Sequence, residues 1–226
     1  MNLFDNEIKL NENVSIKIPK VKDVINNIEH QVFSIVIMQD VREAFSNIPD
    51  KVDIIEERFP TTFDMYFNDE MNFVYGKRFG VERADAIFIM AIEYWTGIKA
   101  ENFEKLQNSE KFICNNPEWV IDKKEFLNIR EYIRIINRYE VDEMLVAPKG
   151  ISKSERVMEA FSKAYERRLE KRQKGQSIED KIIVLQTCQY IPLDEIYEMS
   201  IYHFHRLYEG FVKKEEHNML SIFGAN

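Results

Sequence analysis

Residues 81–95, VERADAIFIMAIEYW, carry the clearest helical pattern of the chain. The apolar residues that define the pattern are Ala84, Ile87, Phe88, Ala91, Ile92 and Trp95. They recur at steps of three and four, which is the spacing of one face of an α-helix. The apolar band is wide enough for burial on most sides, so we expect this helix to form the centre of the N-terminal core.

Composition favours a mainly α-helical protein around this helix. The chain of 226 residues has only 7 glycines and 6 prolines, which are few for a β sandwich with many turns. Hydrophobic residues make up 45% and charged residues 31%, as is typical of a globular protein that buries a core. The predicted fold class is therefore mainly α (α+β), with a helical bundle-like body.

Two short segments show a β pattern instead. Apolar residues alternate with polar ones between Ile8 and Ile18, around a polar turn at residues 11–13. This period of two predicts a small N-terminal β hairpin, which Pro19 ends. Residues 111–121, KFICNNPEWVI, predict a possible second short hairpin near residues 112–121, because Asn-Asn-Pro is a turn signal.

Further helices are predicted from apolar spacing and capping residues. A broad apolar stripe indicates one helix over about residues 20–45, although the β-branched residues 34–37 also suit a strand. Asp122 is placed to cap a helix, with Glu125 three positions later. Ser152 and Glu155 have the same spacing, and the helix that they open is expected to end at residue 175.

The best candidate for a domain boundary is the segment 146–150, VAPKG. A Pro/Gly pair between two helical patterns is a place where few contacts need to cross. We therefore predict an N-terminal hairpin-plus-helix domain over residues 1–147 and a C-terminal helical domain over residues 151–226.

The C-terminal stretch 191–216, IPLDEIYEMSIYHFHRLYEGFVKKEE, reads as a short helix over residues 193–198 followed by a long helix that Ser200 caps. Aliphatic and aromatic side chains keep helical spacing along the long helix, so it is a candidate docking element for a partner protein. The alternative is that the same side chains close the chain's own core. The candidate partner-binding residues are Ile201, Phe204, Tyr208, Phe211 and Val212.

No combination of residues in the sequence specifies a catalytic chemistry. Phosphate-binding glycine loops, nucleophile elbows and zinc-binding HExxH motifs are all absent from the sequence. His203 and His205 are two residues apart on a helix and point to different sides, so they do not form a chelating pair. We expect a protein that is not an enzyme and has no catalytic residue, metal site or cofactor.

The net charge of −8 argues against non-specific nucleic-acid binding by the molecule as a whole. One basic cluster is a possible nucleic-acid contact and comprises Arg167, Arg168, Lys171 and Arg172. The preferred interpretation is a solvated helix whose cations lie near the negative end of the helix dipole and pair with glutamates. The sequence has neither a signal-peptide pattern at its N-terminus nor an apolar span that suits a membrane helix, so we expect no membrane contact.

Three segments carry a resemblance to a known group of proteins: residues 6–25, 121–138 and 178–218. They resemble proteins encoded in the tail gene region of phages and prophages of low-GC Gram-positive bacteria. The last segment is also similar to phage tail assembly chaperones, which often end in a helix pair with the pattern E-I-x-x-M-[ST]-x-x-[EQ]-F. The matching residues are Glu195, Ile196, Met199, Ser200 and Phe204, and His203 departs from the pattern.

This resemblance implies a non-catalytic chaperone that binds the tape-measure protein or another phage tail protein in the host bacterial cytoplasm. Such a chaperone keeps a long apolar helical protein soluble until tube subunits polymerise around it. The alternative is a structural virion component, such as a tail, baseplate or connector subunit, and a homo-oligomer is possible in either case. A DNA-binding regulator with a helix-turn-helix module is the third reading, although Tyr202, His203 and His205 stand where base-reading Arg, Asn or Gln are usual.

Overall fold

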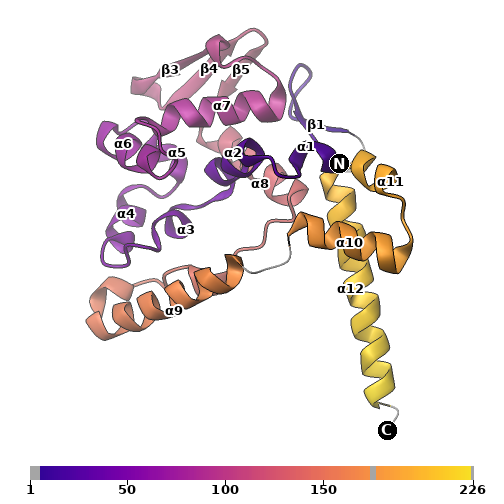
Figure 1. Ribbon diagram of the computed structural model, residues 1–226. Coiled ribbons are helices and arrows are strands. Elements are labelled where there is room, and N and C mark those ends of the chain that lie inside the picture. Colours follow the sequence, from indigo (N-terminus) through magenta and orange to yellow (C-terminus); the bar gives the residue numbers. More distant parts are fainter. Residues whose placement is uncertain (1–5, 174–176, 225–226) are drawn as a thin grey trace.

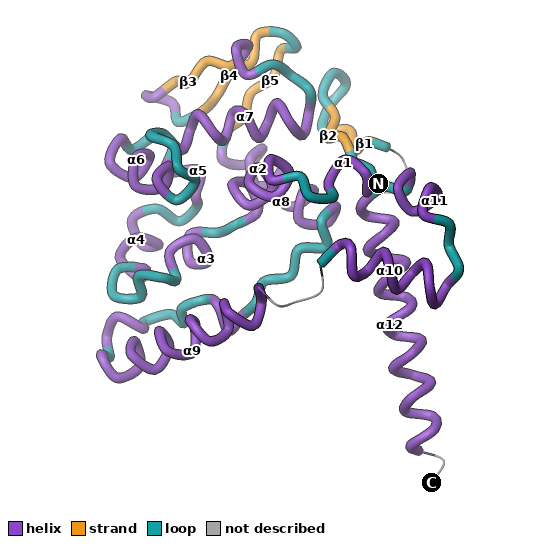
Figure 2. The backbone as a smooth tube through the Cα atoms, in the orientation of Figure 1, coloured by secondary structure: helices purple, strands orange, loops and turns teal. Residues whose placement is uncertain are grey.

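The computed structural model describes residues 6–173 and 177–224, with the side chains of residues 170–173 and 221–224 outside this description. The described residues form 12 α-helices and two small antiparallel sheets, which confirms the mainly α fold with an N-terminal hairpin (Figures 1 and 2). The helices are α1 (Val21–Val24), α2 (Ile28–Met38), α3 (Val41–Phe45), α4 (Val52–Arg58), α5 (Thr62–Met65), α6 (Asp69–Lys77), α7 (Ala84–Thr96), α8 (Lys123–Ile136), α9 (Glu155–Gln173), α10 (Ile178–Gln189), α11 (Leu193–Glu198) and α12 (Ile201–Gly224). No helix in the described ranges is both long and apolar enough to cross a bilayer.

Helix α7 lies at the centre of the body, as its apolar pattern predicts. It runs beneath the three-stranded sheet and packs against α2 and α6 (Figure 1). Phe88 of α7 stacks on Tyr66 with 4.7 Å between ring centroids, and Phe63 stacks on Phe126 of α8 at 5.2 Å. Phe112 of the sheet closes the same cluster, 5.3 Å from Phe88. Burial of these rings therefore joins helices and sheet in one core.

The predicted single helix over residues 20–45 is wrong, because the chain forms α1, α2 and α3 in its place. Asn26 adopts a left-handed conformation (φ 55°), and the side chain of Asn27 accepts a hydrogen bond from the His30 backbone N–H at 3.0 Å. Asp40 and Glu43 form a capping box that starts α3. These local hydrogen bonds interrupt an apolar stripe that continues through all three helices, and residues 34–37 are helical.

Both hairpins are present, and the second belongs to a larger sheet. Strands β1 (Glu7–Lys9) and β2 (Ser15–Lys17) pair with Ile8 opposite Ile16. Strands β4 (Lys111–Asn115) and β5 (Glu118–Ile121) turn at the predicted place, and β3 (Phe103–Leu106) adds a strand on the other side of β4. Strand β3 has the sequence Phe-Glu-Lys-Leu, in which two charged residues follow each other, so no alternation of apolar and polar residues marks it as a strand.

Arg42 of α3 holds the segment that was predicted to be a domain boundary. Its buried guanidinium donates to the backbone carbonyls of Ala147 and Pro148 at 2.8 and 3.0 Å. It also pairs with Asp53 at 2.7 Å and Glu56 at 2.6 Å, both on α4. The segment is thus tied to the N-terminal helices, while the division of the chain into two domains stays a prediction.

Asp53 anchors the same segment from its other side. Its carboxylate accepts hydrogen bonds from the backbone N–H of Gly150 at 3.0 Å and from the hydroxyl of Ser152 at 2.6 Å. These bonds lower the pKa of Asp53 against the opposing effect of burial. The predicted Ser152 cap is wrong, because its hydroxyl is used here and Ser154 lies at the start of α9 instead.

Replacing Arg42 with methionine should lower the free energy of unfolding by about 3–5 kcal/mol, because the carboxylates and carbonyls around it lose their buried partner. Urea unfolding followed by circular dichroism measures the change. Arg206→Met is the matched control, since its half-exposed pair with Glu209 at 3.6 Å should contribute less than about 1 kcal/mol. Equal stability of the two variants would contradict the anchoring role of Arg42.

Candidate partner-binding helix and the adjoining pocket

The start of α12 is attached to the start of the chain. Val21 donates its backbone N–H to the Met199 carbonyl, and Ile201 donates to the Pro19 carbonyl, both at 2.9 Å. Beside this bridge, Glu198 accepts from Lys20 and Lys22 at 2.5 Å each. Ser200 caps the helix as predicted, by accepting from the His203 N–H at 3.2 Å. The bridge determines where α12 begins and the direction in which it runs.

Two of the predicted docking residues belong to the protein's own core. Ile201 and Phe204 are buried within the body, next to α1 and α8. Neither side chain offers a surface to a partner, so the prediction for these two residues is wrong. The alternative reading of the helix, that it closes its own core, holds for its first turns.

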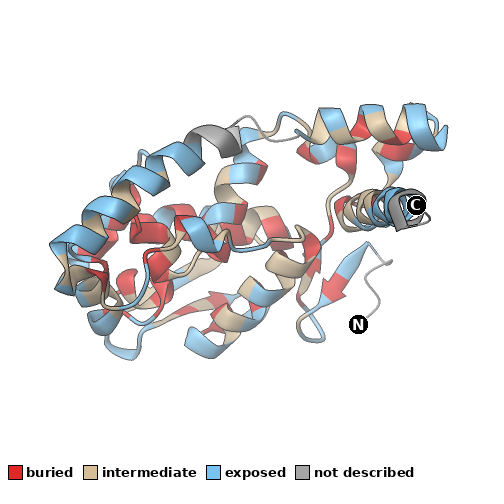
Figure 3. Cartoon of the chain, turned by 90° about the horizontal axis from the view of Figure 1, so that it is seen from below, coloured by how far each residue is buried: buried red, intermediate tan, exposed pale blue. Residues whose placement is uncertain are grey.

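The remaining part of α12 leaves the body. Tyr208, Phe211 and Val212 are half-buried, and every residue from 213 to 220 is exposed. Figure 1 shows this half of the helix extending away from all other elements, and Figure 3 views it nearly end-on. Met219 and Leu220 remain 55% and 72% exposed although both are large and apolar.

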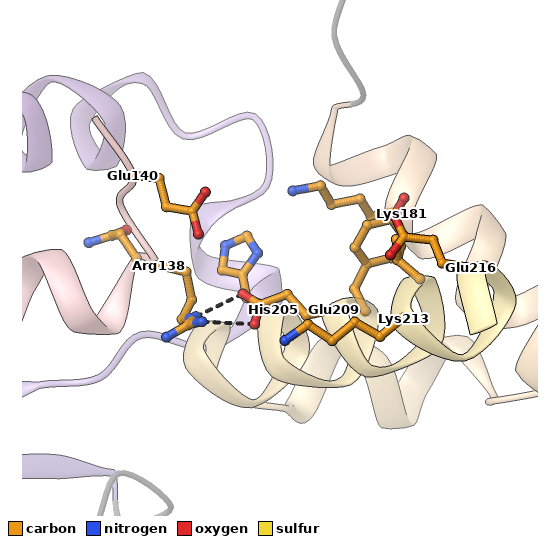
Figure 4. Close-up of a pocket in the computed structure, with 10 residues that line it drawn as sticks. Arg138, Glu140, Lys181, His205, Glu209, Lys213 and Glu216 are labelled. Atoms are coloured by element: carbon orange, nitrogen blue, oxygen red, sulfur yellow. Dashed lines mark hydrogen bonds and ion pairs between the residues drawn. The ribbon is translucent and has the colours of Figure 1, made fainter. Parts of the chain in front are cut away.

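A pocket of about 390 Å³ lies between the segment that follows α8, helix α10 and helix α12 (Figure 4). Its lining combines charged and apolar side chains, and α12 supplies most of them at steps of three and four. The lining residues are Asn137, Arg138, Glu140, Lys181, His205, Tyr208, Glu209, Val212, Lys213 and Glu216. Two predicted docking residues, Tyr208 and Val212, therefore belong to this pocket.

A bidentate ion pair in the pocket joins α12 to the segment that follows α8. Arg138 holds Glu209 with two hydrogen bonds, at 2.7 and 2.8 Å. This pairing lowers the pKa of Glu209 and raises the pKa of Arg138. Bidentate pairs of this kind add geometric specificity, so the contact orients α12 against α8.

Lys181 and His205 are the partly desolvated groups of the pocket. Burial lowers the pKa of Lys181, whose ammonium lies 5.4 Å from the ring centroid of Tyr208. Burial, followed by the positive charge of Lys181, lowers the pKa of His205 to about 4. His205 is therefore neutral near pH 7.

The charges of the pocket balance. Its described lining residues include three cations and three carboxylates, and none of them is a serine, threonine or cysteine. Across the described part of the chain, no group of three or more His, Cys, Asp or Glu residues is placed to hold a metal ion. Along α12, the pocket lining alternates between the half-buried apolar side chains of Tyr208 and Val212 and the charged side chains of Glu209 and Lys213.

The basic cluster lies on α9, which is mostly exposed (Figure 3). Arg168 pairs with Asp142 at 2.9 Å, so its predicted glutamate partner is replaced by an aspartate outside the helix. Arg167 is exposed, and the side chains of Lys171 and Arg172 lie outside the described residues, as does the predicted helix end at Gly175. Nucleic-acid contact at this cluster stays a prediction.

Sequence reasoning missed Arg138 and Lys181 as pocket residues, because they come from other helices and only the fold brings them to α12. The sequence pattern could have identified the pocket residues of α12, since positions 205, 209 and 213 follow one another at four-residue steps. Comparison with known proteins found no matching family model, no similar curated protein and no similar solved structure. What the chain binds has therefore to be inferred from its own residues and from the resemblance of its sequence.

Phe204→Ala should destabilise the fold by about 3–5 kcal/mol, because it removes a fully buried ring. Phe211→Ala should cost clearly less, since this ring is half-exposed at the edge of the core. Urea unfolding of both variants measures the difference. A Phe204 variant as stable as the Phe211 variant would show that the first turns of α12 are not core.

Lowering the pH should weaken the fold through the buried His30 and the half-buried His205. Burial lowers the pKa of His30, like that of His205, to about 4, whereas an unfolded histidine titrates near 6.5. The unfolded chain thus takes up protons first, so stability is full above about pH 6.5 and falls as the pH drops toward about 4. Unfolding free energies between pH 7 and 4 should show this slope.

His205→Gln should reduce that slope, because one of the two shifted groups is gone. His203→Gln, at an exposed position of the same helix, is the matched control, and the His205 variant should have the shallower slope of the two. An unchanged slope in the His205 variant would contradict the assignment.

Proposed function

We propose that this protein is a non-catalytic phage tail assembly protein that binds a helical segment of a tail protein, such as the tape-measure protein, through α12. The observation that carries the proposal is the exposed half of α12, a helix that leaves the body with Met219 and Leu220 uncovered. A docking helix of this kind recognises its partner through apolar anchors at helical spacing. The resemblance of residues 178–218 to tail assembly chaperones supports the same role.

The docking surface of this proposal differs from the one expected from sequence. It comprises the half-buried and exposed apolar side chains of α12, which are Tyr208, Phe211, Val212, Met219 and Leu220. Ile201 and Phe204 position the helix from inside the core. The protein would act in the host cytoplasm while tails assemble.

Mass spectrometry of purified phage or induced prophage particles tests the proposal, together with capture from the producing cell using this protein as bait. We expect the protein to be absent from mature particles and to capture a long helical tail protein. Presence in the particle at fixed copy number would assign it to the virion structure instead. Absence from the particle without a tail protein in the capture would overturn both roles.

The double variant Met219→Asp, Leu220→Asp should lower capture of the tail protein at least about tenfold, because charge replaces the apolar anchors. Ile28→Asp, Ile54→Asp is the matched control, since these side chains are equally large and 73% and 65% exposed on other helices. Quantitative mass spectrometry of the captured protein gives the comparison. Equal losses in the two double variants would contradict docking on α12.

A further inference from the structure

Lys181 is the half-buried charge of the pocket that has no opposite charge bonded to it. Arg138 and Glu209 neutralise each other through their two hydrogen bonds, at 2.7 and 2.8 Å. Lys181 forms no ion pair within the described residues, and its ammonium lies 5.4 Å from the ring centroid of Tyr208. The interior of the pocket therefore keeps one uncompensated positive charge.

The remaining charges of the pocket lie on its rim. Glu140, Lys213 and Glu216 line the pocket and are exposed to solvent. In the described part of the chain, neither of these two carboxylates is paired with Lys181. Exposed groups of this kind would contribute little even as a pair, because water screens their charges. They balance the total charge of the pocket without satisfying the ammonium inside it.

His205 brings a second polar group to the same space. Figure 4 shows the Lys181 side chain, from α10, and the His205 ring, from α12, extending into this space. After burial, the positive charge of Lys181 is the next cause that lowers the pKa of His205, so the two groups lie close together. Neither ring nitrogen of His205 has a hydrogen-bond partner among the described residues. A neutral imidazole therefore offers its N–H donor to a ligand beside the ammonium.

These two donors match the chemistry of a carboxylate. A carboxylate carries one negative charge and two acceptor oxygens, so one oxygen can accept from Lys181 and the other from His205. A phosphate group suits the space less well, because its charge of about −1.5 to −2 would lie near the carboxylate of Glu209. Polar groups that are taken out of water need hydrogen-bond partners, and a carboxylate would supply them to both donors.

The pocket also offers an apolar contact surface. Tyr208 and Val212 are half-buried, and they follow each other at a step of four on α12, which places them on one side of the helix. The pocket volume of about 390 Å³ lies within the range of about 300–1,000 Å³ that is usual for small-molecule sites. Such sites combine apolar side chains with a few polar groups that orient the ligand.

We propose that this pocket binds a small molecule in which one carboxylate is attached to an apolar or aromatic group. The carboxylate accepts hydrogen bonds from the Lys181 ammonium and the His205 imidazole, and the apolar group contacts Tyr208 and Val212. The inference does not depend on the proposed role in tail assembly. Binding of such a molecule without any captured tail protein would leave the inference standing and remove the proposed function. Capture of a tail protein by a chain that binds no such molecule would do the reverse.

Phenylacetate, in which a carboxylate is joined to a phenyl ring, is the probe that tests the proposal on the full chain near neutral pH. Isothermal titration calorimetry should give a dissociation constant of about 1 mM or lower, as expected for an efficient ligand of this small size. Phenylacetamide has a similar shape without the charge and should bind at least about tenfold more weakly. Equal affinities for the two probes would overturn the proposal.

Nuclear magnetic resonance locates the probe in the pocket. The imidazole signals of His205 should move as phenylacetate is added, whereas those of His203, which is exposed and does not line the pocket, should stay in place. His205 signals that do not move at about 10 mM phenylacetate, ten times the expected dissociation constant, would contradict the site.

Lys181→Met should raise the dissociation constant of phenylacetate at least about tenfold, because the ammonium is lost while an unbranched apolar side chain remains. Lys214→Met is the matched control, since Lys214 is exposed on α12 outside the pocket and its replacement should leave the affinity unchanged. Circular dichroism checks that both variants fold. An unchanged affinity of the Lys181 variant would overturn the proposal. Loss of tail-protein capture by this variant, with no binding of phenylacetate to the unsubstituted chain, would also overturn it, because the carboxylate would then belong to the captured protein.

Discussion

Burial of α7 under the sheet is the constraint on which the rest of the molecule depends. The ring of Phe88 on α7 packs against the rings of Tyr66, Phe112 and Phe63. Through Phe63 the aromatic cluster extends to α8. Large rings at these distances contribute both apolar area and specific edge and face contacts. Helices α5 and α8 and strand β4 each present an aromatic side chain to this centre, which stabilises elements that are marginal alone.

The C-terminal helices depend on that body for their position. Two backbone hydrogen bonds join Pro19 and Val21 to the start of α12, and the paired contact between Arg138 and Glu209 orients its next turns. Residues 213–220 are then exposed to solvent. The molecule combines an aromatic-rich body with a helical arm that extends away from it (Figure 1).

Sequence reasoning succeeded where the signal was local. Apolar spacing located α7, alternation and a turn signal located both hairpins, and capping residues located the starts of α8 and α12. It failed where local hydrogen bonds interrupt a continuous stripe, as at Asn26 and Asn27, because hydrophobic spacing is the same on both sides of such a break. It also failed at Ser152, whose hydroxyl is taken by an aspartate on α4 that is distant in sequence.

By itself, the sequence determined that the protein is mainly helical, which helix is central, and that its C-terminal helix is apolar along one face. Only the tertiary structure decided how that face is used. Ile201 and Phe204 are apolar residues at helical spacing, as are Tyr208 and Val212, yet the first two are enclosed by the body and the others border a pocket. The physical reason is that apolar spacing specifies which side of a helix avoids water, whereas the length of helix that is covered depends on where the surrounding elements end.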